Sequence, residues 1–126
     1  MAYRDYKALD LDFVEEGILR LTFNNPRRKN SVSPEQHTEL ARVWLDVDAD
    51  PQVRVVIVTG AGGSFSAGGD FDIIAGMADD FEQRIRVMRE ARDIVYNVVN
   101  CSKPVVSAMA GPAVGAGLAV GLLADV

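Results

Sequence analysis

Two glycine-rich loops carry the residues of this chain whose types and spacing could do chemistry. The run Val53–Thr59, typical of a strand buried on both faces, leads into the loop G-A-G-G-S-F-S-A-G-G-D of residues 60–70. A second apolar run, Val105–Ala110, leads into G-P-A-V-G-A-G of residues 111–117. Glycine lets the backbone approach a ligand closely and adopt positive φ. Two such loops at one sheet edge can aim two backbone N–H groups at one carbonyl oxygen, which is an oxyanion hole for acyl chemistry.

The elements ahead of the first loop are predicted to be a hairpin and a helix. Residues 9–15 and 18–23 alternate apolar and polar side chains around Glu16-Gly17, which is typical of a β-hairpin. Ser33 is the expected N-cap of a helix that has Pro34 at its first position and extends to about Asp48. Its apolar face is predicted to comprise Leu40, Val43, Trp44 and Val47.

Two further helices are predicted after the first loop. Residues 71–77 are expected to be short and irregular, and a long helix then extends from Asp79 or Asp80 to about Asn100. A last helix starts near Val114 and continues to the region of Val126. The resulting order β-β-α-β-α-β-α indicates an α/β domain with largely parallel pairing in its later part. The apolar stripe of the long helix is predicted to comprise Phe81, Ile85, Met88, Val95, Val98 and Val99.

Three segments resemble the signatures of a known enzyme family. The sequence S-F-S-A-G-G-D-F of residues 64–71 resembles the first signature of the enoyl-CoA hydratase/isomerase (crotonase) family, and K-P-V-V-S-A-M-A-G-P-A-V-G-A-G-L-A of residues 103–119 resembles the second. The sequence N-N-P-R-R-K-N-S-V-S of residues 24–33 resembles the segment between the family's second strand and first helix. The resemblance implies a crotonase-like spiral of β-β-α units. Because family members are about twice as long, residues 1–126 are expected to form the N-terminal part of a single domain.

The resemblance also implies roles for particular residues. By motif position, the two oxyanion-hole donors are the backbone amides of Ala67 and Ala116, within reach of one common oxygen of an acyl-CoA thioester. Coenzyme A enters as part of the substrate, with no separately bound cofactor and no metal. The expected contacts to substrate or coenzyme A are Arg27, Arg28, Lys29, Ser66, Ala67, Gly68, Gly69, Asp70, Gly115 and Gly117. A solvated loop is the open alternative for the three cations, and Asp70 is also expected to cap the turn that follows it.

One position departs from the pattern of the family's hydratases. They carry a glutamate two residues after the last glycine of the second signature, where this chain has Ala119. Alanine cannot exchange a proton, so water addition by two carboxylates lacks one member. The family's second acidic residue would lie beyond Val126. Relatives without the first glutamate include isomerases, thioester hydrolases, decarboxylases and silent members, which leaves open an enzyme of enolate chemistry or a CoA-thioester-binding protein without turnover.

The composition argues against several other classes of protein. The net charge is −5, and Arg27-Arg28-Lys29 is the one basic cluster, so nucleic acid is not an expected partner. The single Cys101 and the single His37 are too few for an internal disulfide or a His-rich zinc site. Cys101 is expected to be a small core residue and His37 to lie in water. The first ten residues contain no apolar core of a signal peptide, so a cytoplasmic protein is expected.

Two alternatives compete for the glycine-rich segments. The charge-free stretch Pro104–Ala124 is roughly long enough to span a bilayer, which raises a membrane-associated domain. Gly111 and Pro112 divide the stretch into two pieces that are each too short to span, which disfavours that alternative. A dinucleotide-binding loop competes for G-A-G-G, but it requires a helix that opens directly from the loop, and the next clear helix is expected only near Asp79.

The last predicted helix has consequences for assembly. It is apolar on every side and therefore needs cover on every side. The resemblance implies a homotrimer or a dimer of trimers. The 126 residues alone are expected to self-associate or to need further chain, because a large exposed apolar patch is an interface or an aggregation site.

Overall fold

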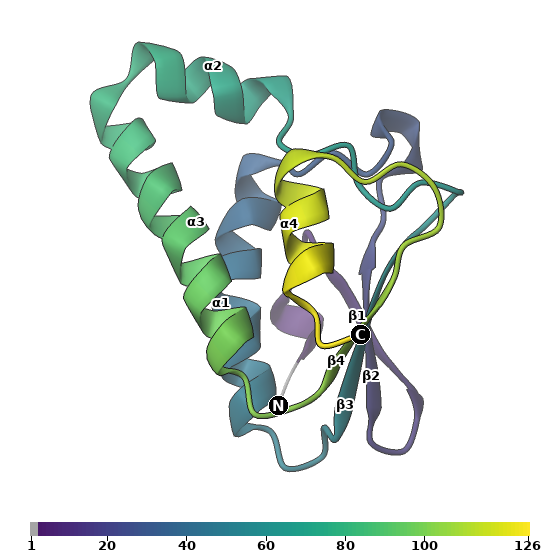
Figure 1. The fold of residues 1–126 in the computed structure, drawn as a ribbon. Helices are drawn as coiled ribbons and strands as arrows, with labels where there is room; N and C mark the ends of the chain where they lie inside the picture. Colours follow the sequence, from purple (N-terminus) through teal and green to yellow (C-terminus); the bar gives the residue numbers. More distant parts are fainter. Residues whose placement is uncertain (1–2) are drawn as a thin grey trace.

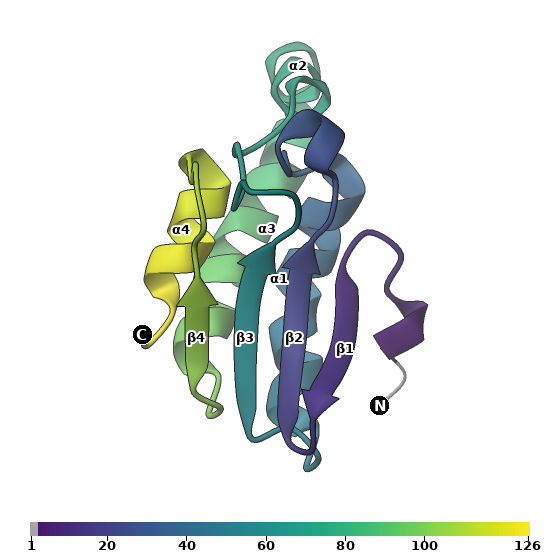
Figure 2. The ribbon, with the colours of Figure 1, turned by 90° about the vertical axis from the view of Figure 1, so that its right-hand side faces the viewer.

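A β-hairpin begins the sheet in the computed structural model, which describes residues 3–126. β1 (Asp10–Glu15) pairs antiparallel with β2 (Ile18–Phe23), as the alternating pattern predicted. β3 (Val55–Gly60) and β4 (Val105–Ala108) continue the sheet in parallel, in the order β1-β2-β3-β4. The predicted parallel pairing of the two strands that precede the glycine loops is therefore confirmed (Figure 2).

Helices cover one face of this sheet. α1 (Pro34–Ala49) and α4 (Gly115–Leu123) lie against it, α3 (Phe81–Asn100) packs on α1, and α2 (Phe71–Asp79) crosses the end of α3 (Figure 1). Two short 3-10 turns, η1 (Tyr3–Asp5) and η2 (Pro26–Arg28), precede β1 and α1. The observed order β-β-α-β-α-α-β-α is the predicted α/β order with one added helix, α2.

The hydrophobic core fills the space between the sheet and α1. The predicted apolar face of α1 is fully buried, and burial contributes about 1.5–3 kcal/mol for each large side chain. β3 is buried on one face only, because Val55 and Ile57 are partly exposed on the side of the sheet that the helices leave open. The prediction of a strand buried on both faces is therefore wrong within this chain. The sheet side chains that face the helices are Leu19, Leu21, Phe23, Val56 and Val58.

Residues 71–77 form part of a helix, which corrects the prediction of an irregular segment. Asp70 caps α2, since its carboxylate accepts a hydrogen bond from the amide of Ile73 at 3.2 Å, and the predicted capping role of Asp70 is confirmed. Gly76 lowers helix propensity by roughly 1 kcal/mol. A Cβ at Gly76 would lie 2.2 Å from the terminal amide of Gln83, so Gly76 leaves room for this side chain of α3. Because α2 opens directly from the first loop, the late helix start no longer argues against a dinucleotide-binding loop.

α3 begins where predicted, with Asp80 as its N-cap, but turns a different face inward. The structure buries Val87, Ile94 and Val98, whereas only Val98 belongs to the predicted stripe. The helix carries two apolar stripes, and packing on α1 uses the one that sequence periodicity did not select. The other members of the predicted stripe are partly or largely exposed: Phe81, Ile85, Met88, Val95 and Val99.

The face of α1 that turns away from the sheet is covered by α3, which corrects the prediction for His37. His37 is 5% exposed and lies between these two helices, not in water. Cys101, which follows α3, is partly buried against the core as predicted, and this burial raises the pKa of its thiol.

α4 is nine residues long and ends at Leu123, earlier than predicted. The chain then returns to β4, where the amide of Asp125 donates to the carbonyl of Val105 at 2.9 Å. No helix within residues 3–126 combines the length and the apolar character needed to cross a bilayer. Apolar side chains of this region nevertheless face solvent, among them Val114 and Leu122.

Candidate active site

The two glycine-rich loops lie side by side at the carboxyl ends of β3 and β4. Ser66 and Ala113 form a parallel bridge between them. The amide of Ser66 donates to the carbonyl of Pro112 at 3.1 Å, and the amide of Val114 donates to the carbonyl of Ser66 at 2.9 Å. The prediction that both loops occupy the same edge of the sheet is therefore confirmed.

Glycine is required where the loops touch. A Cβ at Gly117 would lie 2.2 Å from the Cβ of Ser66, a separation that real side chains do not reach. Gly68 has a φ of 89°, and a Cβ there would lie 2.9 Å from the carbonyl oxygen of Val114. Both residues are buried, and the absence of a side chain at each lets the first turn of α4 pack against the first loop.

The first turn of α4 presents free backbone donors. Its N-cap is Val114, whose side chain cannot accept a hydrogen bond, and the first helical hydrogen bond is donated by the amide of Leu118. In residues 3–126 no acceptor lies against the amides of residues 115–117, which include Ala116. Helices leave such groups unpaired at their N-termini, where the macrodipole also favours negative charge. This end of α4 can therefore hold an anionic oxygen.

The amides of the first loop differ in their availability. The amide of Ala67, predicted to be a donor to the ligand, instead donates to the carbonyl of Lys29 at 2.9 Å. The amide of Gly68 donates to the hydroxyl of Ser66 at 3.2 Å. Across the part of the chain that the structure describes, the amide of Gly69 has no acceptor, and a Cβ at Gly69 would meet no atom within 4 Å. Gly69 therefore offers an open donor two residues after Ala67.

A hollow of about 600 Å³ joins the first loop to the cationic segment. Its walls combine the predicted cations Arg27, Arg28 and Lys29 with part of the predicted loop. The three cations come from η2 and the residue after it, and their side chains are exposed. The predicted residues of the loop that line the hollow are Ala67, Gly69 and Asp70.

Asn30 ties the cationic segment to the first loop. Its side-chain amide nitrogen donates to the carbonyls of Ala61 at 2.8 Å and Ser64 at 2.9 Å, and its side-chain oxygen accepts from the amide of Asn25 at 2.8 Å. Its carbonyl accepts a hydrogen bond from the hydroxyl of Ser66 at 2.8 Å. Asn30 has a φ of 58°, a conformation that asparagine adopts more readily than most residues. One buried side chain thus fixes both walls of the hollow.

Comparison with known proteins identifies the family to which this arrangement belongs. A model of the family described as enoyl-CoA hydratase/isomerase matches residues 14–126. The chain belongs to this family. The crotonase-like α/β fold is thereby shown, and the first loop belongs to that fold rather than to a dinucleotide-binding domain.

Individual members of the enoyl-CoA hydratase/isomerase family match over nearly the whole chain. A probable enoyl-CoA hydratase of Mycobacterium tuberculosis is 37% identical over 90% of this chain and 43% of its own length. The 1,2-epoxyphenylacetyl-CoA isomerase of Escherichia coli is 35% identical over 92% of this chain and 45% of its own length. The crystal structure of an enoyl-CoA hydratase/isomerase from Mycobacterium paratuberculosis matches with a TM-score of 0.90 and 38% identity, over 94% of this chain and 47% of that chain. The chain thus spans a little under half the length of the relatives it matches.

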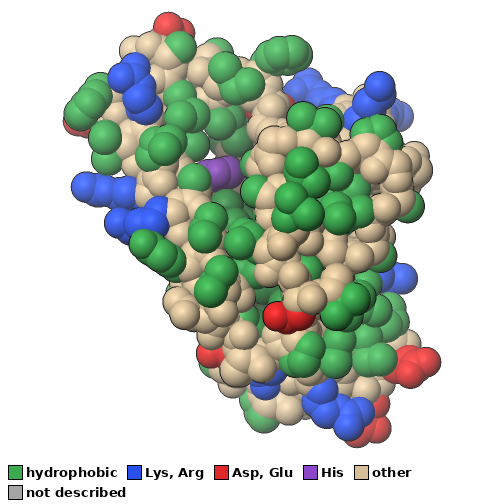
Figure 3. Space-filling view, in the orientation of Figure 1, with side chains coloured by type: hydrophobic (Ala, Val, Ile, Leu, Met, Phe, Trp, Pro, Cys, Tyr) green, Lys and Arg blue, Asp and Glu red, His purple; other side chains and the backbone are tan. Residues whose placement is uncertain are grey.

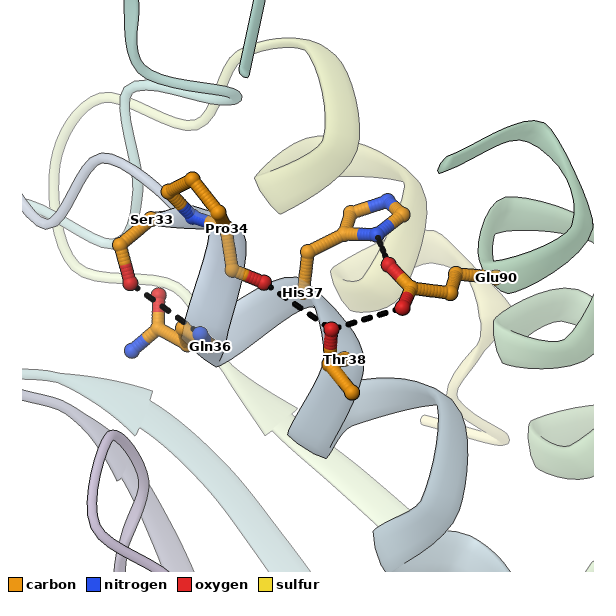
Figure 4. Close-up of polar contacts among 6 residues, drawn as sticks. All are labelled: Ser33, Pro34, Gln36, His37, Thr38 and Glu90. Carbon is orange, nitrogen blue, oxygen red and sulfur yellow. Dashed lines mark hydrogen bonds and ion pairs between the residues drawn. The ribbon is translucent and has the colours of Figure 1, made fainter. Parts of the chain in front are cut away.

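Sequence analysis missed one polar pair in the helical layer. His37 Nδ1 lies 2.8 Å from Glu90 Oε1, which joins α1 to α3 (Figure 4). The hydroxyl of Thr38 donates to the other carboxylate oxygen of Glu90 at 2.7 Å. The partners are more than fifty residues apart in the chain, so no local pattern could have joined them.

Asn30→Ala is expected to destabilise the complete protein by roughly 2–4 kcal/mol, because it leaves three backbone groups without their partner. The matched control is Asn24→Ala, since Asn24 is exposed and, among residues 3–126, its side chain bonds only Asp10, at 2.7 Å. That change should cost no more than about 0.5 kcal/mol. Urea denaturation of both variants measures the difference. Equal midpoints for the two variants would show that Asn30 does not hold the loops.

Proposed function

We propose that this chain forms the part of an acyl-CoA enzyme that binds the thioester and stabilises its enolate. The two donors to the thioester oxygen are the backbone amides of Gly69 and Ala116, with Gly69 in place of the Ala67 expected from the motif. The observation that carries the proposal is that both amides lack an acceptor within residues 3–126, on loops that are hydrogen-bonded to each other. Two preorganised donors stabilise the charge that develops on a carbonyl oxygen when a proton leaves the neighbouring carbon.

The coenzyme A part of the substrate is proposed to bind along the hollow beside the first loop. Arg27, Arg28 and Lys29 line this hollow with exposed side chains, and cations of this kind bind phosphate groups. The phosphates of coenzyme A supply the matching negative charge. The positions of the cations and of Gly69 at one hollow support a single extended ligand.

The reaction is proposed to be a double-bond isomerisation or another reaction through an enolate, rather than efficient hydration. Ala119 lies exposed on α4, at the position where the family's hydratases carry glutamate. The Escherichia coli relative that matches this chain is named as an isomerase. The second candidate function, acyl-CoA binding without turnover, is favoured by the same alanine. Both candidates share the two amide donors and differ in whether a proton is moved.

Assembly through the uncovered apolar side chains is also proposed, with a trimer or a dimer of trimers as the form that the family resemblance implies. Val114 and Leu122 are largely exposed, as are several apolar residues of α3, and exposed apolar area of this kind promotes association. Sedimentation velocity of the complete protein is expected to give a trimer or hexamer. A monodisperse monomer would contradict this proposal.

Ala119→Glu is expected to raise the rate at which the complete protein hydrates crotonyl-CoA. The wild type should hydrate this substrate roughly 10²–10⁴-fold more slowly than an efficient hydratase, because one acid–base group is missing. The exposed position of residue 119 leaves room for the larger side chain. Loss of the conjugated thioester absorbance measures the rate, and Ala119→Gln is the control of equal size. A fast wild-type rate, or an equal gain in both variants, would refute the assignment of this position.

Ala116→Pro tests the amide donor directly, because proline lacks the N–H and is tolerated in the first turn of a helix. Infrared spectroscopy of bound butyryl-CoA with a ¹³C-labelled carbonyl should show a lowered C=O stretching frequency in the wild type. The shift should shrink clearly in Ala116→Pro and persist in Ala116→Gly, which keeps the amide. Any turnover of the complete protein should fall roughly 10²–10³-fold with the donor. A wild-type carbonyl that binds without a frequency shift would defeat the proposed function.

A further inference from the structure

The single histidine lies at the bottom of a furrow. Figure 3 shows the imidazole between the arm formed by α2 and α3 and the body that carries α4. His37 is 5% exposed, so most of the ring is held by protein and a small part reaches the furrow. α4 contributes no titratable side chain to this furrow, because its sequence is G-A-G-L-A-V-G-L-L. From α3, the charged group that contacts His37 is Glu90.

The hydrogen bonds around Glu90 orient the imidazole. Both carboxylate oxygens accept, one from His37 Nδ1 at 2.8 Å and the other from the Thr38 hydroxyl at 2.7 Å (Figure 4). A carboxylate has no proton to donate, so Nδ1 carries a hydrogen, and in the neutral imidazole Nε2 then has the lone pair. Within the described residues, Nε2 has no hydrogen-bond partner. An imidazole held in this way by a carboxylate can accept a proton, and the carboxylate then stabilises the imidazolium.

His37 lies on a helix that is tied to the first loop, and it faces α4 across the furrow. Val32 bridges Gly69, and His37 follows Val32 by five residues, at the end of the first turn of α1. The facing helix is α4. Its first turn contains Ala116, and Ala119 lies one turn further along. The imidazole therefore faces the furrow whose other wall carries α4, the helix whose first turn contains Ala116.

We propose that His37 is a catalytic acid–base residue and that Glu90 is its positioning residue. This inference rests on the proposed function. Nε2 takes a proton from the carbon next to the thioester carbonyl, and the C–H electron pair passes into an enolate whose oxygen is held by the amides of Gly69 and Ala116. The imidazolium returns a proton to the same carbon, or to the far end of a conjugated enolate, which shifts the double bond. The cycle consumes no oxidant or further reactant and supplies the proton transfer that Ala119 cannot.

The test follows deuterium incorporation at the second carbon of butyryl-CoA in deuterium oxide, by mass spectrometry, with the complete protein. This saturated thioester cannot be hydrated, so exchange reports proton transfer alone. His37→Gln should reduce the exchange rate roughly 10²–10⁴-fold, while the Kd for butyryl-CoA changes little. Glu90→Gln, which keeps an acceptor but loses the charge, should reduce exchange by roughly tenfold or more.

The matched control is Asn97→Ala. Asn97 also joins α3 to α1, through a 2.7 Å hydrogen bond to the carbonyl of Ala41, but it cannot carry a proton. This variant should lower the unfolding midpoint and leave exchange unchanged. Equal loss of exchange in Asn97→Ala and His37→Gln would overturn the proposal in favour of a packing role. A wild type that binds butyryl-CoA and polarises its carbonyl without exchange would overturn the role of His37 and leave the proposed function standing, whereas a failure to bind would remove both.

Discussion

The contact between two stretches of backbone sets the position of everything else in this molecule. The first loop and the start of α4 approach so closely that a single methyl group at Gly117 would collide with Ser66. The approach is possible because β3 and β4 are adjacent and parallel, so that both loops leave the sheet at the same edge. The same loop is bridged to Val32, just before α1, which ties the helical layer to this edge. A displacement of any one of these elements would separate the loops.

The helix termini show how the chain distributes its backbone donors. Ser33, Asp70 and Asp80 each cap a helix by accepting hydrogen bonds from its first amides. α4 has Val114 at the corresponding position and no side-chain cap. Replacing a polar cap with an apolar residue costs about 0.5–2 kcal/mol of stability. This loss of stability falls on α4, whose first turn follows the second loop. The amides of that turn have no side-chain cap and are open to a ligand.

The sequence could predict what short-range pattern determines. The hairpin, the buried face of α1 and the two strand–loop units follow from periodicity and glycine placement, and the structure contains all of them. It could not predict which face of α3 would pack inward, because that helix has two apolar stripes and the choice depends on α1. For the same reason it placed His37 in water, since the helix that covers this residue lies more than forty positions later. A motif also locates a loop without telling which amides are already bonded, and the bond from Ala67 to Lys29 is visible only in three dimensions.

The division of the site between loops and helices explains why Ala119 need not abolish enolate chemistry. Stabilising the oxygen requires fixed backbone, and the two hydrogen-bonded loops provide it without any particular side chain. Moving a proton requires a side chain held by a second contact, and the His37–Glu90 pair meets that requirement from α1 and α3. The two requirements fall on separate elements, so the residue at position 119 can change without disturbing the loops. In the proposed enzyme, the backbone of the loops would bind the anion whatever the reaction, and the side chains around the furrow would select the reaction.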